Sequence, residues 1–143
     1  MADRSATTVW QGSVQEGSGE THLDSSDLTT VKVTAATRFG EPEGHTSPEE
    51  LLAAAHASCW SMALSSTLSS GGTAPERIEA TATCTVKGTG GGFEITTMKI
   101  RATATVPGMD SAAFDEAVQK TNETCPVSRA LSAIDVQVEA SLA

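Results

Sequence analysis

The sequence predicts an α+β fold in which hairpin-like strands surround two helical regions. Small apolar residues alternate with polar ones, as they do in strands, on both sides of an alanine-rich segment that begins at Ser47. The helical segments are spaced unevenly among the strands, which favours α+β over a doubly wound parallel sheet. With 143 residues and no internal repeat or linker, the chain is expected to form a single domain over residues 1–143.

Three strands are expected before the helix. Residues 5–14 and 19–26 lie on either side of a turn that contains glycine. Alternating apolar residues from Val31 predict a third strand that ends near Arg38. The Gly- and Pro-containing segment 40–46 is then expected to form a loop.

The start of the first helix carries three signals. Ser47 suits the N-cap, Pro48 suits the first helical position, and Glu50 completes a capping box. Small and apolar residues continue to Leu68, and the sequence SSGG at 69–72 ends the helix. We therefore expect a helix of about six turns.

The second half of the chain reads as a hairpin, two helices and a last strand. Residues 76–88 and 93–106 alternate and are joined by a glycine-rich turn. A helix opened by Asp110 or Ser111 is expected to break at Cys125-Pro126, where a short helix begins. Residues 134–142 alternate again and predict the final strand.

Charge and hydropathy narrow the possible partners. A net charge of −9 without a basic stripe argues against a nucleic acid. No apolar run approaches the roughly 18 residues of a membrane span, and the first residues lack the apolar core of a secretory signal. We expect a cytoplasmic protein with neither membrane nor nucleic acid as partner. Because aromatic residues are few, burial against a second copy would enlarge the core, which suggests an oligomer.

The three cysteines fit neither a disulfide framework nor a metal site. Structural disulfides are disfavoured in a reducing cytosol. The sequence has no C-x-x-C, and the Cys–His spacing lacks the second ligand pair that a zinc site needs. Any thiol chemistry must therefore use cysteines that the fold brings together.

The two glutamates of the first helical turn point in different directions. At 100° per residue, Glu50 points about 180° away from Cys59, whereas Glu49 lies about 80° from it and about 20° from His56. Capping explains Glu50. Glu49 either favours the helix dipole or serves a site on the side of the thiol.

Local chemistry separates the thiols but leaves their roles open. Cys59 lies in the middle of a helix, where it is either a small buried residue or a nucleophile that needs a nearby cation such as Arg38. Cys125 begins a helix, where the dipole and free N–H groups favour a thiolate. Cys84 lies on the apolar face of a strand and is expected to belong to the core.

Several motifs together resemble the OsmC/Ohr family of thiol peroxidases, which respond to osmotic and organic hydroperoxide stress. These are SPEELLAAAHASCWSMALS, the sequence CPVS that follows 66 residues after Cys59, the segment PGMDSAAFDEAVQK, and the early VWQGSVQEGSG. The resemblance covers nearly the whole chain. The sequence AAHASC and the Arg after the third strand are more similar to the OsmC branch than to the Ohr branch.

The resemblance implies roles for four residues. Cys59 would be the peroxidatic cysteine and Cys125 the resolving one, while Arg38 and Glu49 would be the catalytic arginine and its partner. Organic hydroperoxides, and more weakly hydrogen peroxide, would oxidise Cys59 to a sulfenic acid that condenses with Cys125 to a disulfide. An external dithiol would then reduce the disulfide, without a metal or other cofactor.

The same resemblance implies mostly antiparallel sheets wrapped around long central helices in an intertwined homodimer, with both active sites at the subunit interface. Two alternatives remain at this point. One is a small-ligand or interaction module that keeps the fold without the chemistry. The other is a cysteine hydrolase with His56 as its base, which would lack a visible group to orient the histidine and a role for Cys125.

Overall fold

A computed structural model describes all of residues 1–143. The chain forms two compact units, residues 1–51 and 52–143, and each is described by itself. Helix α1 (Pro48–Ser70) begins in the first unit and continues through the second. The single domain expected over residues 1–143 stays a prediction. No helix is long and apolar enough to cross a membrane.

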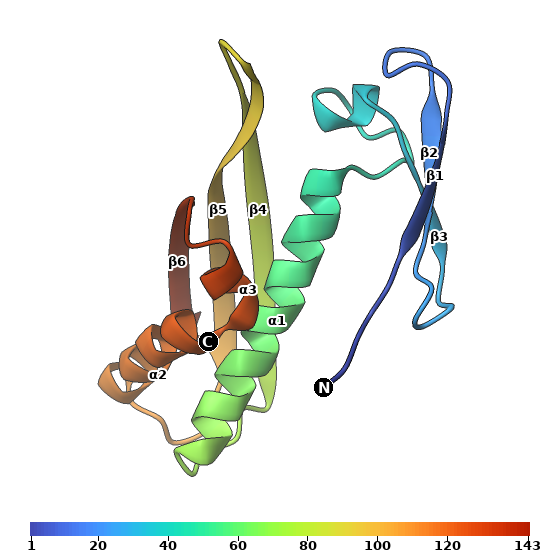
Figure 1. Cartoon of the computed structure of the whole chain (residues 1–143). Coiled ribbons are helices and arrows are strands. Elements are labelled where there is room, and N and C mark those ends of the chain that lie inside the picture. Colours follow the sequence, from blue (N-terminus) through green and yellow to red (C-terminus); the bar gives the residue numbers. More distant parts are fainter. The chain divides into compact units, whose positions relative to one another are not determined.

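The first unit contains a three-stranded antiparallel sheet in the order β1 (Thr7–Gln11), β2 (Ser18–His22) and β3 (Thr30–Val33) (Figure 1). Residue Gly19 of β2 lies where two side chains close over the backbone. A Cβ atom there would stand 2.9 Å from carbon atoms of both Trp10 and Val33. This position in the sheet therefore requires glycine.

The expected end of the third strand is wrong. Strand β3 ends at Val33, and Ala36–Arg38 form a single 3-10 turn, η1. The cause is the pair Thr34 and Thr37: the Thr37 N–H donates to the Thr34 hydroxyl at 3.2 Å, and the Thr37 hydroxyl donates to the Thr34 carbonyl at 2.9 Å. Threonine hydroxyls that bond the local backbone compete with a strand ladder. Arg38 consequently ends a turn rather than a strand.

Helix α1 confirms the predicted start and length within two residues. The Glu50 N–H donates to the Ser47 hydroxyl at 3.2 Å, so Ser47 is the N-cap. The Glu50 carboxylate accepts a hydrogen bond from the Thr46 hydroxyl instead of the Ser47 N–H, so only one of the two bonds of the predicted capping box forms. At the other end the chain turns through Gly72, whose positive φ of 95° suits glycine.

The second unit contains β4 (Arg77–Thr89) and β5 (Gly92–Thr105), which form the predicted antiparallel hairpin. Helices α2 (Ser111–Thr124) and α3 (Pro126–Ala130) connect β5 to β6 (Asp135–Leu142). Because of this helical crossover, β6 pairs parallel to β5. The Asp110 carboxylate accepts a hydrogen bond from the Ala113 N–H at 3.0 Å, which confirms Asp110 as the cap of α2.

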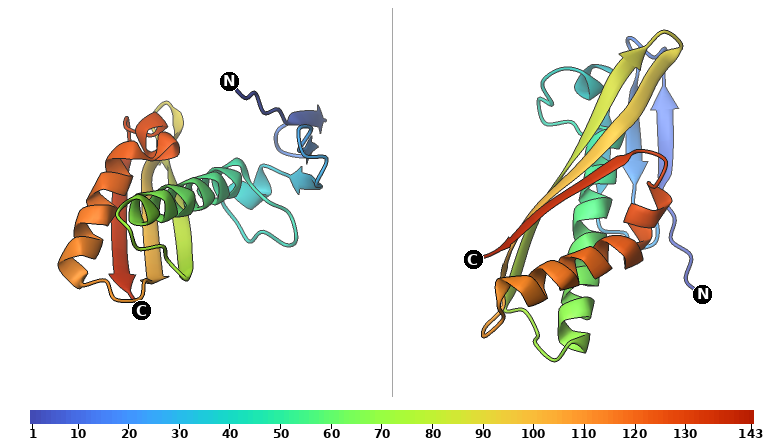
Figure 2. Two further views of the ribbon diagram at one scale, coloured as in Figure 1. Left: turned by 90° about the horizontal axis from the view of Figure 1, so that it is seen from below. Right: turned by 90° about the vertical axis from the view of Figure 1, so that its left-hand side faces the viewer.

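Helix α2 and the main part of α1 lie on one face of this sheet (Figure 2). The core contains one stripe of α1 at four-residue spacing, together with large side chains of the sheet and of α2. Its fully buried side chains include Trp60, Leu64, Leu68, Ile100 and Phe114. Small residues of β5 such as Ala102 and Ala104 are also buried there, which lets the helices approach the sheet closely. This core holds α1 and fixes which of its side chains face inward.

Candidate active site

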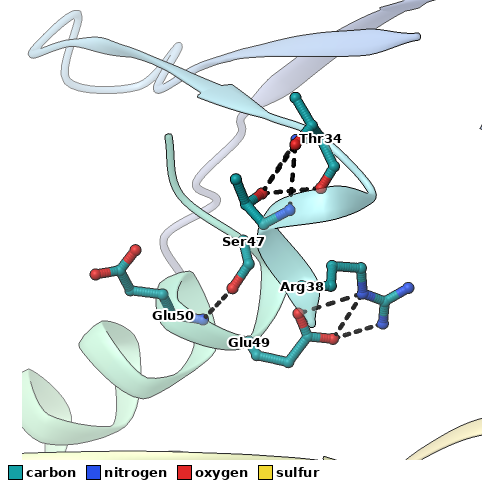
Figure 3. Close-up of polar contacts among 6 residues, drawn as sticks. Thr34, Arg38, Ser47, Glu49 and Glu50 are labelled. Carbon is teal, nitrogen blue, oxygen red and sulfur yellow. Dashed lines mark hydrogen bonds and ion pairs between the residues drawn. The ribbon is translucent and has the colours of Figure 1, made fainter. Parts of the chain in front are cut away.

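Arg38 and Glu49 form a two-pronged ion pair within the first unit (Figure 3). The Arg38 Nε atom donates to Glu49 Oε1 at 3.0 Å and to Oε2 at 3.3 Å, and Nη2 donates to Oε1 at 2.5 Å. The η1 turn presents Arg38, and the first turn of α1 presents Glu49. Because the Nε and Nη2 atoms of the guanidinium both donate to the carboxylate, the orientation of the guanidinium plane is fixed.

The environment of this pair keeps both groups charged. The hydrogen bond from Arg38 to Glu49 raises the pKa of the arginine. Burial raises the pKa of Glu49, but hydrogen bonds from Arg38, from the backbone and from Ser47 outweigh it and leave that pKa below its ordinary value. Arg38 therefore supplies a permanent positive charge, and its ion pair with Glu49 fixes the orientation of the guanidinium group.

A mostly apolar cavity of about 480 Å³ lies beside Arg38 in the same unit. Its apolar lining includes Trp10, Val33 and Leu51. A cavity with a single cation at its wall suits a molecule with an alkyl or aromatic body and one polar end.

The sulfur atoms of Cys59 and Cys125 lie 3.6 Å apart in the second unit. Both thiols are free. Cys59 comes from the middle of α1, and Cys125 links α2 to α3, where Pro126 ends one helix and begins the next. The Cys125 N–H completes α2 by donating to the Thr121 carbonyl at 2.8 Å. A disulfide is about 2.05 Å long, so bond formation needs only a small approach of the two sulfurs.

The two thiols have opposite pKa shifts. Burial raises the pKa of Cys59, and its hydrogen bond with Cys125 raises it further. Burial also raises the pKa of Cys125, but hydrogen bonds from the Ser128 hydroxyl and from the N–H groups of Ser128 and Val127 lower it below its ordinary value. Within the second unit, Cys125 is thus the sulfur that more readily carries a negative charge. This direction agrees with the expectation from its place at a helix start.

The ring of His56 is fully buried and its Nε2 atom lies 2.8 Å from the Ser128 hydroxyl oxygen. Its Nδ1 atom has no hydrogen-bond partner. Burial lowers the pKa of His56, so the ring is neutral near pH 7. Sequence reasoning does not identify Ser128 as a site residue, although its place three residues after Cys125 in a short helix is a signal that points to it.

Other predicted residues lie outside these pairs. Cys84 is half-buried in the middle of β4, where it faces Met98 in the register of the sheet. No three His, Cys, Asp or Glu side chains gather in the way that a metal ion requires. The structure thus joins the four predicted site residues as two pairs, Arg38 with Glu49 and Cys59 with Cys125.

We predict that Glu49→Gln removes a pH-dependent contribution to stability. The pKa of Glu49 is lower in the folded chain than the roughly 4.3 of an unfolded glutamate, so its contribution is present above about pH 5. That contribution is lost as the pH falls through the folded pKa. The difference in unfolding free energy between wild type and Glu49→Gln, measured with urea, should therefore be constant near neutrality and shrink below about pH 4.

The control is the same substitution in an Arg38→Gln background. Without the guanidinium, burial dominates the pKa of Glu49, and the difference should vanish or change sign. An unchanged difference in that background would show that Arg38 does not stabilise the carboxylate.

Comparison with known proteins assigns the chain to a family. Residues 40–139 match the model of the family described as OsmC-like protein. The sequence is 40% identical over 124 residues to peroxiredoxin OsmC of Escherichia coli, which covers 87% of this chain and 86% of that protein. A peroxiredoxin OsmC of Shigella flexneri matches equally well.

Solved structures share the fold. An OsmC-like protein of unknown function from Vibrio cholerae aligns with a TM-score of 0.78 at 16% identity, covering 99% of this chain and all of the other. A putative organic hydroperoxide resistance protein of the same species, with captopril bound in one of its active sites, aligns with a TM-score of 0.76 at 25% identity, covering 98% and 92% of the two chains. The match to the family model and the 40% identity to peroxiredoxin OsmC show that the chain belongs to the OsmC family.

Proposed function

We propose that this cysteine-based peroxidase of the OsmC family reduces organic hydroperoxides, and hydrogen peroxide more weakly, through a sulfenic acid on Cys59 and a Cys59–Cys125 disulfide. The observation that carries the proposal is the 3.6 Å separation of the two sulfurs. Two free thiols so close, from separate helices, form an intrachain disulfide with little movement of the backbone. The relatives' names, peroxiredoxin and organic hydroperoxide resistance protein, support the same chemistry.

In the proposed first step, the Cys59 thiolate attacks the distal oxygen of the hydroperoxide. The O–O bond breaks and the distal OH group goes to the sulfur, so that Cys59 becomes a sulfenic acid. The other oxygen leaves as the alcohol, with the proton that the Cys59 thiol released when it ionised. Because burial and Cys125 raise the pKa of Cys59, this thiolate needs a cation from outside its own surroundings. Arg38, held by Glu49, is the candidate.

The spacing along α1 indicates whether Arg38 acts on Cys59 of its own chain or on Cys59 of a second copy. Glu49 and Cys59 are ten residues apart in this helix, a rise of about 15 Å, which is longer than an arginine side chain. We therefore propose a homodimer in which the Arg38–Glu49 pair of one copy faces Cys59 of the other. Large apolar side chains that stay exposed in the single chain support a partner surface; they include Val9, Val14, Leu28, Phe39 and Met62.

The apolar cavity beside Arg38 supports the preference for organic substrates. Its lining of Trp10, Val33 and Leu51 would bury an alkyl or aromatic group, while Arg38 would face the peroxide oxygens. Hydrogen peroxide has no apolar group to bury. It would use the same thiol but gain no binding free energy from the cavity.

In the proposed last step, an external dithiol reduces the disulfide. A thiol of lower pKa leaves a disulfide more readily, so attack on Cys59 with Cys125 as the leaving group is favoured. Since this step draws on a pool of reduced dithiols, a cytoplasmic setting suits the cycle.

The apolar cavity also supports a second candidate, a ligand-binding module without chemistry. That candidate gives the two adjacent thiols no role. A hydrolase with His56 as base is disfavoured, because the Nε2 atom of the ring is engaged with Ser128 rather than with a thiol.

We predict that Cys59→Ser abolishes turnover of an organic hydroperoxide with dithiothreitol, because the nucleophile is lost. Cys84→Ser, a matched change in the same unit, should leave turnover within about twofold of wild type. Steady-state rates with cumene hydroperoxide and with hydrogen peroxide check both this and the substrate preference. The proposal would be contradicted if folded Cys84→Ser lost as much turnover as folded Cys59→Ser. It would also be contradicted if the wild type turned over hydrogen peroxide faster than cumene hydroperoxide.

Mixed dimers test the placement of Arg38. Cys59→Ser and Arg38→Ala homodimers should each be nearly inactive, and unfolding and refolding them together should form mixed dimers. If Arg38 acts across the interface, each mixed dimer has one intact site, and the random mixture recovers about a quarter of wild-type activity. No recovery, with mixed dimers shown by native mass spectrometry, would place Arg38 and Cys59 of the same chain together.

A further inference from the structure

The buried His56–Ser128 hydrogen bond has no role in the function proposed above. His56 is fully buried and Ser128 nearly so, at 0% and 7% exposure. A buried, neutral histidine that bonds a buried serine costs free energy in desolvation, which a pair of apolar residues would avoid. The position of the pair suggests what it does.

This bond repeats the geometry of the sulfur contact. His56 lies three residues before Cys59 in α1, and Ser128 lies three residues after Cys125, in α3. Two contacts one turn apart therefore join α1 to α3 and to Cys125, the residue that precedes α3: Nε2 to Oγ at 2.8 Å and sulfur to sulfur at 3.6 Å. Because residues three apart share a helix face, fixing one contact fixes the other.

The donor and acceptor roles in the His56–Ser128 hydrogen bond also connect this pair to Cys125. The Nδ1 atom of His56 has no partner, and a buried N–H without a partner is rarer than a bare acceptor, so we assign the proton to Nε2. Nε2–H then donates to the Ser128 oxygen, which leaves the Ser128 proton free for another acceptor. The Cys125 sulfur, one turn before Ser128, suits that acceptor, and the lowering of the pKa of Cys125 by the Ser128 hydroxyl agrees with this assignment.

We propose that His56 and Ser128 are a positioning pair for the resolving step, which hold Cys125 against Cys59 so that the sulfenic acid is captured before a second peroxide reaches it. The inference rests on the proposed function. In the step itself, the Cys125 sulfur attacks the Cys59 sulfur, the S–S bond forms and the S–O bond breaks. The hydroxide leaves with the proton of Cys125 as water, the sulfenic sulfur is reduced and the Cys125 sulfur is oxidised.

The test measures how Cys59 is partitioned between disulfide and sulfinic acid. Reduced full-length protein is exposed to rising excesses of cumene hydroperoxide with dithiothreitol, and peptide mass spectrometry gives the sulfinic fraction per turnover. Ser128→Ala and His56→Leu should raise that fraction roughly two- to tenfold, the effect of losing one hydrogen bond. The rate of the first oxidation of Cys59, followed by stopped flow, should stay the same.

Two controls separate positioning from stability. His56→Gln keeps an N–H near the place of Nε2 and should return the partition close to wild type. Thr121→Val removes another buried hydroxyl of this unit, which bonds the Ala117 carbonyl at 2.7 Å, and should lower stability without changing the partition.

The inference is overturned if Ser128→Ala gives the same sulfinic fraction of Cys59 as wild type, or if Thr121→Val raises that fraction as much as Ser128→Ala does. It is also overturned if His56→Gln raises the sulfinic fraction as much as His56→Leu. A wild-type protein that forms no Cys59–Cys125 disulfide would instead overturn the proposed function.

Discussion

The contact between the Cys59 and Cys125 sulfurs depends on the packing of α1 in the second unit. His56, Trp60, Leu64 and Leu68 recur every four residues and form one buried stripe of the helix. Cys59 lies beside that stripe, so burial of Trp60 against the sheet and α2 sets the direction of the thiol. The indole N–H of Trp60 donates to the Asn122 side-chain oxygen at 2.8 Å, which ties α1 to the helix that precedes Cys125. A cavity made in this stripe would therefore move the thiols apart as well as reduce stability.

The electrostatics of the two thiols explains why the proposed site has two parts. Within its own unit Cys59 has a raised pKa, and Cys125 has a lowered one. That asymmetry suits the resolving and recycling steps, in which Cys125 is first a nucleophile and then a leaving group. It does not suit attack on peroxide by Cys59. In the proposed dimer, the Arg38–Glu49 pair of a second copy supplies the missing charge.

The parts of the fold that local rules govern could be predicted from the sequence. Caps at Ser47 and Asp110, the break at Pro126 and the hairpin of β4 and β5 follow from side-chain chemistry within a few residues, and the structure confirms them. The turn at Arg38 could not, because strand-like alternation continues past Val33, while the competing bonds of Thr34 and Thr37 leave no periodic signal. The parallel pairing of β6 depends on which sheet edge is free, which no local pattern records.

Local patterns predict the contacts of the candidate site that join residues close in sequence, but not those that join distant residues. The 100° step between helical residues is enough to separate Glu49 from Glu50, because both lie in the same turn of one helix. The bond between His56 and Ser128 joins residues 72 positions apart, and only tertiary packing reveals it. Neither residue is exposed at the surface, where a functional group is usually sought.

The proposed cycle depends on a disulfide between Cys59 and Cys125 of one chain. Peptide mass mapping of the reduced protein, after treatment with one equivalent of organic hydroperoxide, shows whether this disulfide forms. We expect an intrachain Cys59–Cys125 disulfide with Cys84 still reduced, and in Cys125→Ser a sulfenic acid on Cys59. A bridge that contains Cys84, or one that joins two chains, would contradict the proposed cycle.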